Sequence, residues 1–194
     1  MGMRNQTLPF ALWNLATREF RSLPKLSPNF PPDMLSGHET YGFGFDPITN
    51  DYKVVSIWNT WDPFREIISP YKAAVYTLST DSWRYLDHVA LPYSIIHTPQ
   101  SNTCINGIYQ WFAMDNDRHP VILSFDMGNE LFDEISDITP YSKHAVLAPY
   151  NNNSLPLINY DSFSTVDIRV MMEEGCWTKQ STLQFPLLSS PCCL

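Results

Sequence analysis

The side chains best suited to acid–base or metal chemistry are spread along this chain without the spacing that such chemistry requires. No histidine belongs to an H-E-x-x-H or similar ligand pattern, and no G-x-S-x-G segment presents a nucleophilic serine. The five histidines are His38, His88, His97, His119 and His144. We therefore predict no catalytic residue, no metal site and no cofactor.

Two other segments look chemically suggestive and have simpler explanations. Gly42-Phe43-Gly44 begins like a phosphate-binding loop, but Pro47 stands where G-x-G-x-x-G requires its third glycine. Glu173 and Glu174 are adjacent, so on a strand they would face opposite ways, and a solvated turn explains them better than an acid–base pair. Carboxylates from separate parts of the fold could still converge, although the sequence gives no positive sign of this.

The elements that would position any site are indicated by a repeat. In five places a bulky apolar residue, usually aromatic, is followed seven positions later by an aromatic one, with turn-forming residues between. Each copy predicts a short β-hairpin. The five pairs are Trp13 and Phe20, Phe45 and Tyr52, Tyr76 and Trp83, Phe125 and Phe132, and Val170 and Trp177.

Prolines that end the second arm of these hairpins indicate how the hairpins group. Pro92, Pro140 and Pro186 are separated by 48 and 46 residues, which suits propeller blades of about 40 to 50 residues. Residues 41–57 and 73–91 would form one blade, 103–114 and 121–138 a second, and 145–160 with 163–185 a third. Residues 59–70 have the composition of an inserted loop.

The resulting prediction is an all-β, kelch-type β-propeller fold with about three and a half four-stranded blades. The propeller-like domain would cover residues 1–187, with an irregular tail at residues 188–194. Because three and a half blades do not close a ring, we expect a fragment, a truncated gene product or a degenerate copy.

Composition places the chain among globular proteins, with 44% hydrophobic, 14% aromatic and 16% charged residues. No apolar run approaches the roughly 20 residues that a membrane-spanning helix needs, and the N-terminal residues lack a secretory signal pattern. The four cysteines have neither a disulfide framework's density nor metal-ligand spacing. We expect a cytoplasmic or nuclear protein with reduced thiols and no membrane partner.

Charge is concentrated in one acidic segment. The net charge is −8, and residues 115–137 hold seven acidic residues against Arg118 alone. Such a field disfavours nucleic acid and attracts basic proteins, unless it is simply a solvated blade edge. The candidate protein-binding residues in this segment are Asp115, Asp117, Glu130, Asp133 and Glu134.

A second candidate surface lies in residues 58–65. Trp58, Trp61, Phe64 and Arg65 have the composition of an interface hot spot. The alternative, which we weigh about equally, is that these side chains fold back over the propeller as a plug.

Two segments resemble a known family. Residues 13–24 (WNLATREFRSLP) and 41–55 (YGFGFDPITNDYKVV) resemble the "NPATREFRLLP" and "GFGYDPKTNDYKVV" segments of plant F-box proteins, in the expected order, with Leu15 replacing the usual proline. They mark the F-box-associated domain, and the pattern is close to the S-locus F-box subgroup. We expect the F-box itself to be absent. We expect structural roles for the motif residues Trp13, Asn14, Thr17, Arg18, Phe20, Gly42, Gly44, Asp46, Pro47, Asp51, Tyr52 and Lys53.

The resemblance implies a non-enzymatic, substrate-recognition module of a cullin-RING ubiquitin ligase. The target would be a protein, and in the S-locus subgroup it would be a basic pistil ribonuclease. The ligase adaptor would bind only through an F-box, which we expect this chain to lack. Two alternatives remain: a generic kelch-like interaction scaffold without a ligase role, and a carbohydrate-binding propeller.

Overall fold

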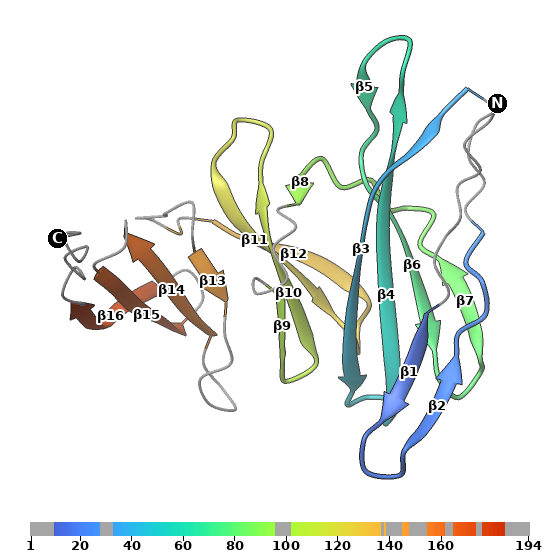
Figure 1. Cartoon of the computed structure of the whole chain (residues 1–194), viewed down its shortest axis with the longest axis horizontal. Coiled ribbons are helices and arrows are strands. Elements are labelled where there is room, and N and C mark those ends of the chain that lie inside the picture. The colour runs from blue at the N-terminus through green and yellow to red at the C-terminus, as the bar shows by residue number, and fades with distance from the viewer. Residues whose placement is uncertain are drawn as a thin grey trace, which may run out of the picture. The chain divides into compact units, whose positions relative to one another are not determined.

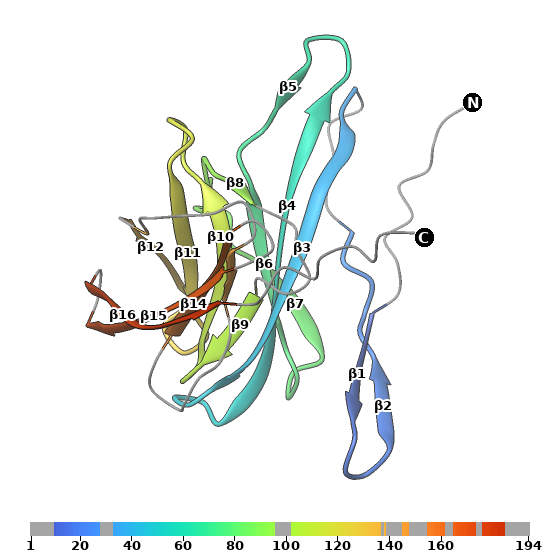
Figure 2. The ribbon, with the colours of Figure 1, turned by 60° about the vertical axis from the view of Figure 1, so that its left-hand side comes forward.

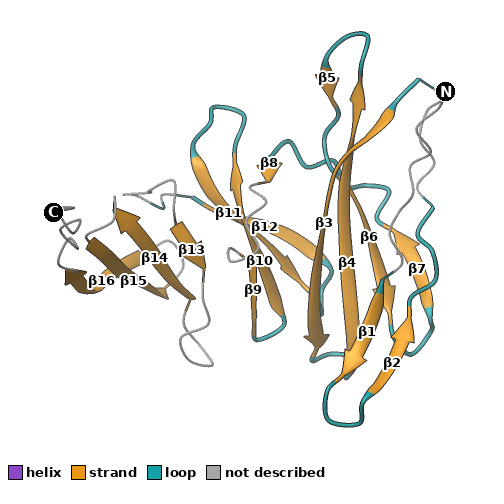
Figure 3. Cartoon of the chain, in the orientation of Figure 1, coloured by secondary structure: helices purple, strands orange, loops and turns teal. Residues whose placement is uncertain are grey.

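The computed structural model describes residues 10–27, 33–95, 102–136, 138, 145–147, 155–161, 165–173 and 176–184. Every regular element assigned within these ranges is a β-strand (Figure 3), which confirms the all-β prediction. The chain divides into two compact units, Met1–Pro92 and Tyr93–Leu194. Each unit is described separately below.

The first unit contains a two-stranded ribbon and one larger antiparallel sheet (Figures 1 and 2). The ribbon consists of β1 (Ala11–Asn14) and β2 (Glu19–Ser22). The sheet has the order β3-β4-β6-β7, with the short β5 also paired to β4. Its strands are β3 (Leu35–Asp46), β4 (Asp51–Asp62), β5 (Ile67–Ile68), β6 (Lys72–Thr77) and β7 (Ser82–Tyr85). Hairpins 41–57 and 73–91 therefore combine as predicted.

The second unit contains two antiparallel sheets. The first is formed by β8 (Ser94–Ile95), β9 (Asn102–Ile105), β10 (Ile108–Met114), β11 (Pro120–Asp126) and β12 (Leu131–Ile135). The second is formed by β13 (Ala145–Leu147), β14 (Leu155–Asp161), β15 (Thr165–Glu173) and β16 (Cys176–Gln184). A shared apolar core joins them, formed by Phe112, Ile122, Ile135, Ile138, Leu147 and Leu157. Three sheets built on four-strand meanders and one ribbon agree with three and a half blades; the predicted tail lies outside the described residues.

A four-residue turn explains the seven-residue spacing of the aromatic pairs. Residues seven apart stand directly opposite each other when the turn has four residues and one pair of opposed strand residues lies between the turn and the aromatic pair. The directly opposed pairs are Trp13 and Phe20, Phe45 and Tyr52, Tyr76 and Trp83, and Phe125 and Phe132. In the last hairpin Trp177 instead faces Met171, and a register shift lies between Met171 and Glu173, so the predicted pairing with Val170 is off by one residue.

Three of these five turns, and the turn between β4 and β5, share one cap. The residue before the turn is Asn or Asp, and its Oδ1 accepts hydrogen bonds from the backbone N–H groups two and three residues later. The caps are Asn14 (3.0 and 3.3 Å), Asp46 (2.7 and 3.2 Å), Asp62 (2.9 and 3.1 Å) and Asp126 (2.7 and 3.0 Å). The fourth turn residue takes a positive φ of 60° at Arg18, 55° at Asn50, 56° at Glu66 and 57° at Glu130.

Asp46 also forms a buried ion pair. Its Oδ2 lies 2.7 Å from Lys53 Nζ, and both side chains are almost completely inaccessible. Lys53 stands directly opposite Gly44, whose missing side chain leaves the lysine room to reach along the sheet. Burial alone would raise the pKa of Asp46, but hydrogen bonds from Lys53, Thr49 and the backbone outweigh it and lower the pKa to about 2.

Replacing Lys53 with methionine should strongly destabilise the first unit, because Asp46 would remain buried without its counter-charge. We expect Lys53→Met to cost about 3–5 kcal/mol of unfolding free energy in denaturant titration. The matched control is Lys72→Met on the exposed side of the same sheet, which should change stability by less than about 0.5 kcal/mol. Equal stability of the two variants would contradict the structural role of the ion pair.

The lowered pKa of Asp46 also predicts a pH dependence. The unfolded carboxyl titrates near 3.8 and the folded one near 2, so its stabilising contribution is complete above about pH 4 and is lost as the pH falls toward 2. The stability advantage of the parent chain over Asp46→Asn should shrink by about 2 kcal/mol between pH 5 and pH 2. A pH-independent difference in unfolding free energy would be inconsistent with this shift.

Candidate protein-binding surfaces

The far end of the first sheet differs from the predicted loop at residues 59–70. Strand β4 continues through Asp62, and only residues 63–66 form a turn before β5. The strand persists because its polar residues are satisfied: the Thr60 N–H donates to Ser69 Oγ at 2.9 Å, and the His38 N–H donates to Asn59 Oδ1 at 2.7 Å. The expected insertion is thus an ordered hairpin.

This hairpin end carries an exposed apolar surface, which we call the β4–β5 tip. Leu35, Trp61 and Ile68 are consecutive cross-strand neighbours on β3, β4 and β5, so they share one face. Phe64, in the turn, is 85% exposed. The tip consists of Leu35, Trp61, Phe64, Ile67 and Ile68, all exposed. Arg65 stands beside it, with Nη1 3.6 Å from Asp62 Oδ2.

Trp58 does not belong to the β4–β5 tip. It is 3% exposed and packs with Leu26 and Ala74 in the core of the first unit. Its ring meets that of Tyr85 edge-on, with centroids 6.0 Å apart. This corrects the grouping of Trp58 with Trp61, Phe64 and Arg65 as one loop surface, because the strand turns Trp58 to the buried face.

The β1–β2 ribbon carries a second exposed aromatic pair. Trp13 and Phe20 are 65% and 74% exposed, although the sequence indicated structural roles for both. The opposite face of the ribbon is attached to the rest of the first unit through Arg21, which contacts Asp81 Oδ2 at 3.1 Å and donates to the Leu78 carbonyl at 3.3 Å. The alternation of side chains along β1 and β2 was the sequence signal that puts Trp13 and Phe20 on one face.

The other motif residues have local structural positions. Thr17 and Arg18 form part of the first turn, and Pro47 is exposed in the second. Gly42 and Gly44 lie on the buried face of β3. Asp51 Oδ2 accepts the Ser79 N–H at 3.1 Å, so it caps a turn of the neighbouring hairpin.

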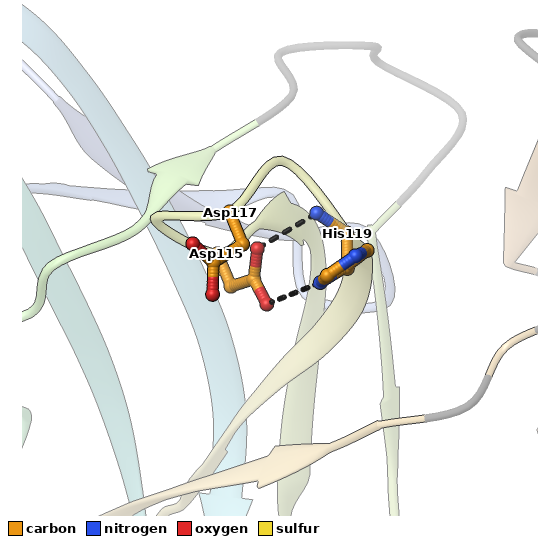
Figure 4. A group of neighbouring side chains, drawn as sticks. All are labelled: Asp115, Asp117 and His119. Carbon is orange, nitrogen blue, oxygen red and sulfur yellow. Dashed lines mark hydrogen bonds and ion pairs between the residues drawn. The ribbon is translucent and has the colours of Figure 1, made fainter.

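Three residues of the acidic segment meet in the turn between β10 and β11 (Figure 4). Asp115 accepts a hydrogen bond from the His119 N–H at 2.7 Å, and its other oxygen lies 3.2 Å from His119 Nδ1. The backbone bond is the main cause of the lowered pKa of Asp115. Potential ligand atoms of Asp115, Asp117 and His119 lie within 4.8 Å of one another, which the sequence spacing did not indicate. The group lies on the surface, so it presents charge to solvent.

The other acidic candidates separate into engaged and exposed groups. Both oxygens of Glu134 accept hydrogen bonds of 2.6 Å, from Tyr93 OH and Ser136 Oγ. Burial, with the bond to Glu134, raises the pKa of Tyr93 to about 12. Glu130 is half-buried in its turn, whereas Asp133 is exposed. Asp133 and Asp117 are therefore the more accessible of the predicted acidic contacts.

Charge divides unequally between the two units. The first unit has eight Lys and Arg residues against nine Asp and Glu residues, whereas the second has four against eleven. Nearly all of the net negative charge therefore belongs to the second unit. Within the described ranges no helix has the length and apolar character needed to cross a membrane.

Sheets of antiparallel meanders with exposed hairpin ends define a propeller-type domain whose surfaces suit macromolecular recognition. The chain belongs to the F-box associated beta propeller domain family, whose model matches residues 1–186.

Similar proteins come from Arabidopsis thaliana. "Putative F-box protein At3g22650" is 29% identical over 198 residues, which cover 94% of this chain and 49% of that protein. "F-box protein CPR1" is 25% identical over 212 residues, covering 96% and 50%. "F-box protein At5g10340" is 31% identical over 138 residues, covering 66% and 30%. The chain spans about half or less of the length of these relatives.

Truncation to alanine should lower the stability of the chain strongly at Trp58 and hardly at all at Phe64. Trp58→Ala would leave a cavity in the first unit and cost about 3–5 kcal/mol, whereas Phe64→Ala, at an exposed turn, should change stability by less than about 0.5 kcal/mol. Thermal and denaturant unfolding measure both. A large loss with Phe64→Ala would assign that ring to a covered position.

Proposed function

We propose that this chain is the substrate-recognition module of an F-box protein and binds a target protein for ubiquitination. In the complete protein, an F-box would contact the ligase adaptor, and the propeller-type domain would select the target. Membership of the F-box associated family is the observation that carries this proposal. The relatives that support it are themselves named F-box proteins.

The β4–β5 tip is the surface that we assign to target contact. Trp61 and Phe64, with Arg65 at the rim, provide the aromatic and guanidinium groups that dominate binding energy at protein interfaces. The tip stands at the end of a paired hairpin, so its side chains are presented by ordered strands. Little ordering entropy would then be lost on binding.

The acidity of the second unit favours a basic target. Asp117 and Asp133 are exposed there, and the negative charge of eleven acidic residues against four basic ones would raise the rate of encounter with a cationic protein. A basic pistil ribonuclease, as in the S-locus subgroup, is the specific target we propose. Binding, rather than catalysis by this chain, would be its role.

Capture from pistil extract at low ionic strength tests this function. The immobilised chain should retain a small set of basic proteins, ribonuclease among them, and release them as salt is raised. Combining Trp61→Ala and Phe64→Ala should reduce their retention by about tenfold or more. Thermal stability should be nearly unchanged.

The matched control is Ile48→Ala, which removes an exposed apolar side chain from another turn of the same sheet. It should retain the same proteins as the parent chain. Equal retention by the tip double variant, or an absence of selective capture, would contradict the assignment of the β4–β5 tip to target contact.

A further inference from the structure

A groove of about 690 Å³ lies within the first unit, between the β1–β2 ribbon and the sheet. The residues that matter for its chemistry are Leu12, Glu19, Arg21, Phe43, Tyr52 and Leu78. It lies apart from the β4–β5 tip, because none of the tip residues borders it. The groove joins the two sequence segments that carry the family resemblance.

The sheet contributes an aromatic wall. Phe43 on β3 and Tyr52 on β4 stack nearly parallel, with ring centroids 5.5 Å apart and planes inclined by 10°. Both residues are 46% exposed, so the pair is only partly covered by other described residues. Faces of such rings attract cations through their quadrupoles.

The ribbon contributes the opposite wall with a carboxylate. Its register places Leu12, Arg21 and Glu19 on one face and Trp13 with Phe20 on the other. Leu12, Glu19 and Arg21 line the groove, and Arg21 also reaches the Leu78 carbonyl and Asp81. Trp13 and Phe20 border the groove as well, so both faces of the ribbon contribute to its lining. Leu12 is more protected than Trp13.

The charges around the groove leave an acidic excess. The guanidinium of Arg21 is paired with Asp81, and Asp51 is engaged by the Ser79 N–H. The side-chain carboxylate of Glu19 forms no hydrogen bond or ion pair with the part of the chain that the structure describes. A carboxylate beside exposed ring faces is complementary to a cation with an apolar stem.

We propose that this groove binds an arginine side chain of the target, with its guanidinium over the Phe43–Tyr52 pair and paired with Glu19. The stem of the arginine would lie against Leu12 and Leu78. This inference rests on the proposed function, because it gives a basic target protein a second contact. The proposed contact is defined by the chemistry of an arginine side chain and not by the name of the target protein.

Peptide binding to the purified chain tests the groove without the target protein. An acetylated, amidated Gly-Gly-Arg-Gly-Gly peptide should bind about tenfold more tightly than the same peptide with citrulline, which is isosteric and neutral. Glu19→Gln should weaken arginine-peptide binding by about threefold to tenfold and leave citrulline binding unchanged. Tyr52→Leu should weaken binding of the arginine peptide similarly, as followed by ligand-observed NMR titration at low salt.

The controls are Phe64→Ala and Glu66→Gln, an exposed aromatic residue and an exposed carboxylate at the tip, which should leave peptide binding unchanged. Equal binding of the arginine and citrulline peptides, or no binding, would overturn the proposal. So would concentration-dependent dimerisation abolished by Tyr52→Leu, since a second copy would then occupy the groove. Target capture through the β4–β5 tip would survive each of these outcomes, so the two proposals fail separately.

Discussion

The capped four-residue turn is the local constraint on which the rest of the chain depends. When an Asn or Asp side chain holds two backbone N–H groups of the turn, the number of turn residues is fixed and so is the pairing of the strands that follow. A shift of one residue would exchange the buried and exposed faces of both strands. The same capped turn begins at Leu15, Pro47, Pro63 and Met127, so one kind of interaction sets the register of hairpins in both units.

Asp46 shows how the turn is joined to the core. One of its oxygens holds the turn, and the other meets Lys53 in a buried ion pair. Gly44, Asp46 and Lys53 are therefore parts of one structural arrangement, which explains their positions in residues 41–55. The functional surfaces follow from the same geometry, because a fixed register turns Trp58 inward and leaves Trp61 at the exposed end of the strand.

Local features were the ones that the sequence could predict. The aromatic pairs and the all-β class depend on residues close in sequence, where turn chemistry and alternation are readable. The grouping of hairpins into sheets was indicated by the regular spacing of prolines. The loop predicted at residues 59–70 was wrong because the partners that keep Asn59 and Thr60 in a strand, His38 and Ser69, cannot be identified from composition.

The candidate sites were less predictable because they depend on distant contacts. Glu134 is engaged by Tyr93, 41 residues away, and the ribbon that borders the groove is joined to a distant hairpin through Arg21 and Asp81. No periodicity encodes such pairs. The register shift near Met171 was also hidden, since a single bulge leaves the hydrophobic pattern of the strands nearly unchanged.

Cross-strand nuclear Overhauser contacts in the isotope-labelled chain test the register most directly. We expect backbone contacts that place Trp13 opposite Phe20, Phe45 opposite Tyr52 and Phe125 opposite Phe132, the three aromatic pairs whose turns carry the cap. Contacts displaced by one residue in these hairpins, or their absence, would contradict the claim that the capped turns determine which side chains this domain presents.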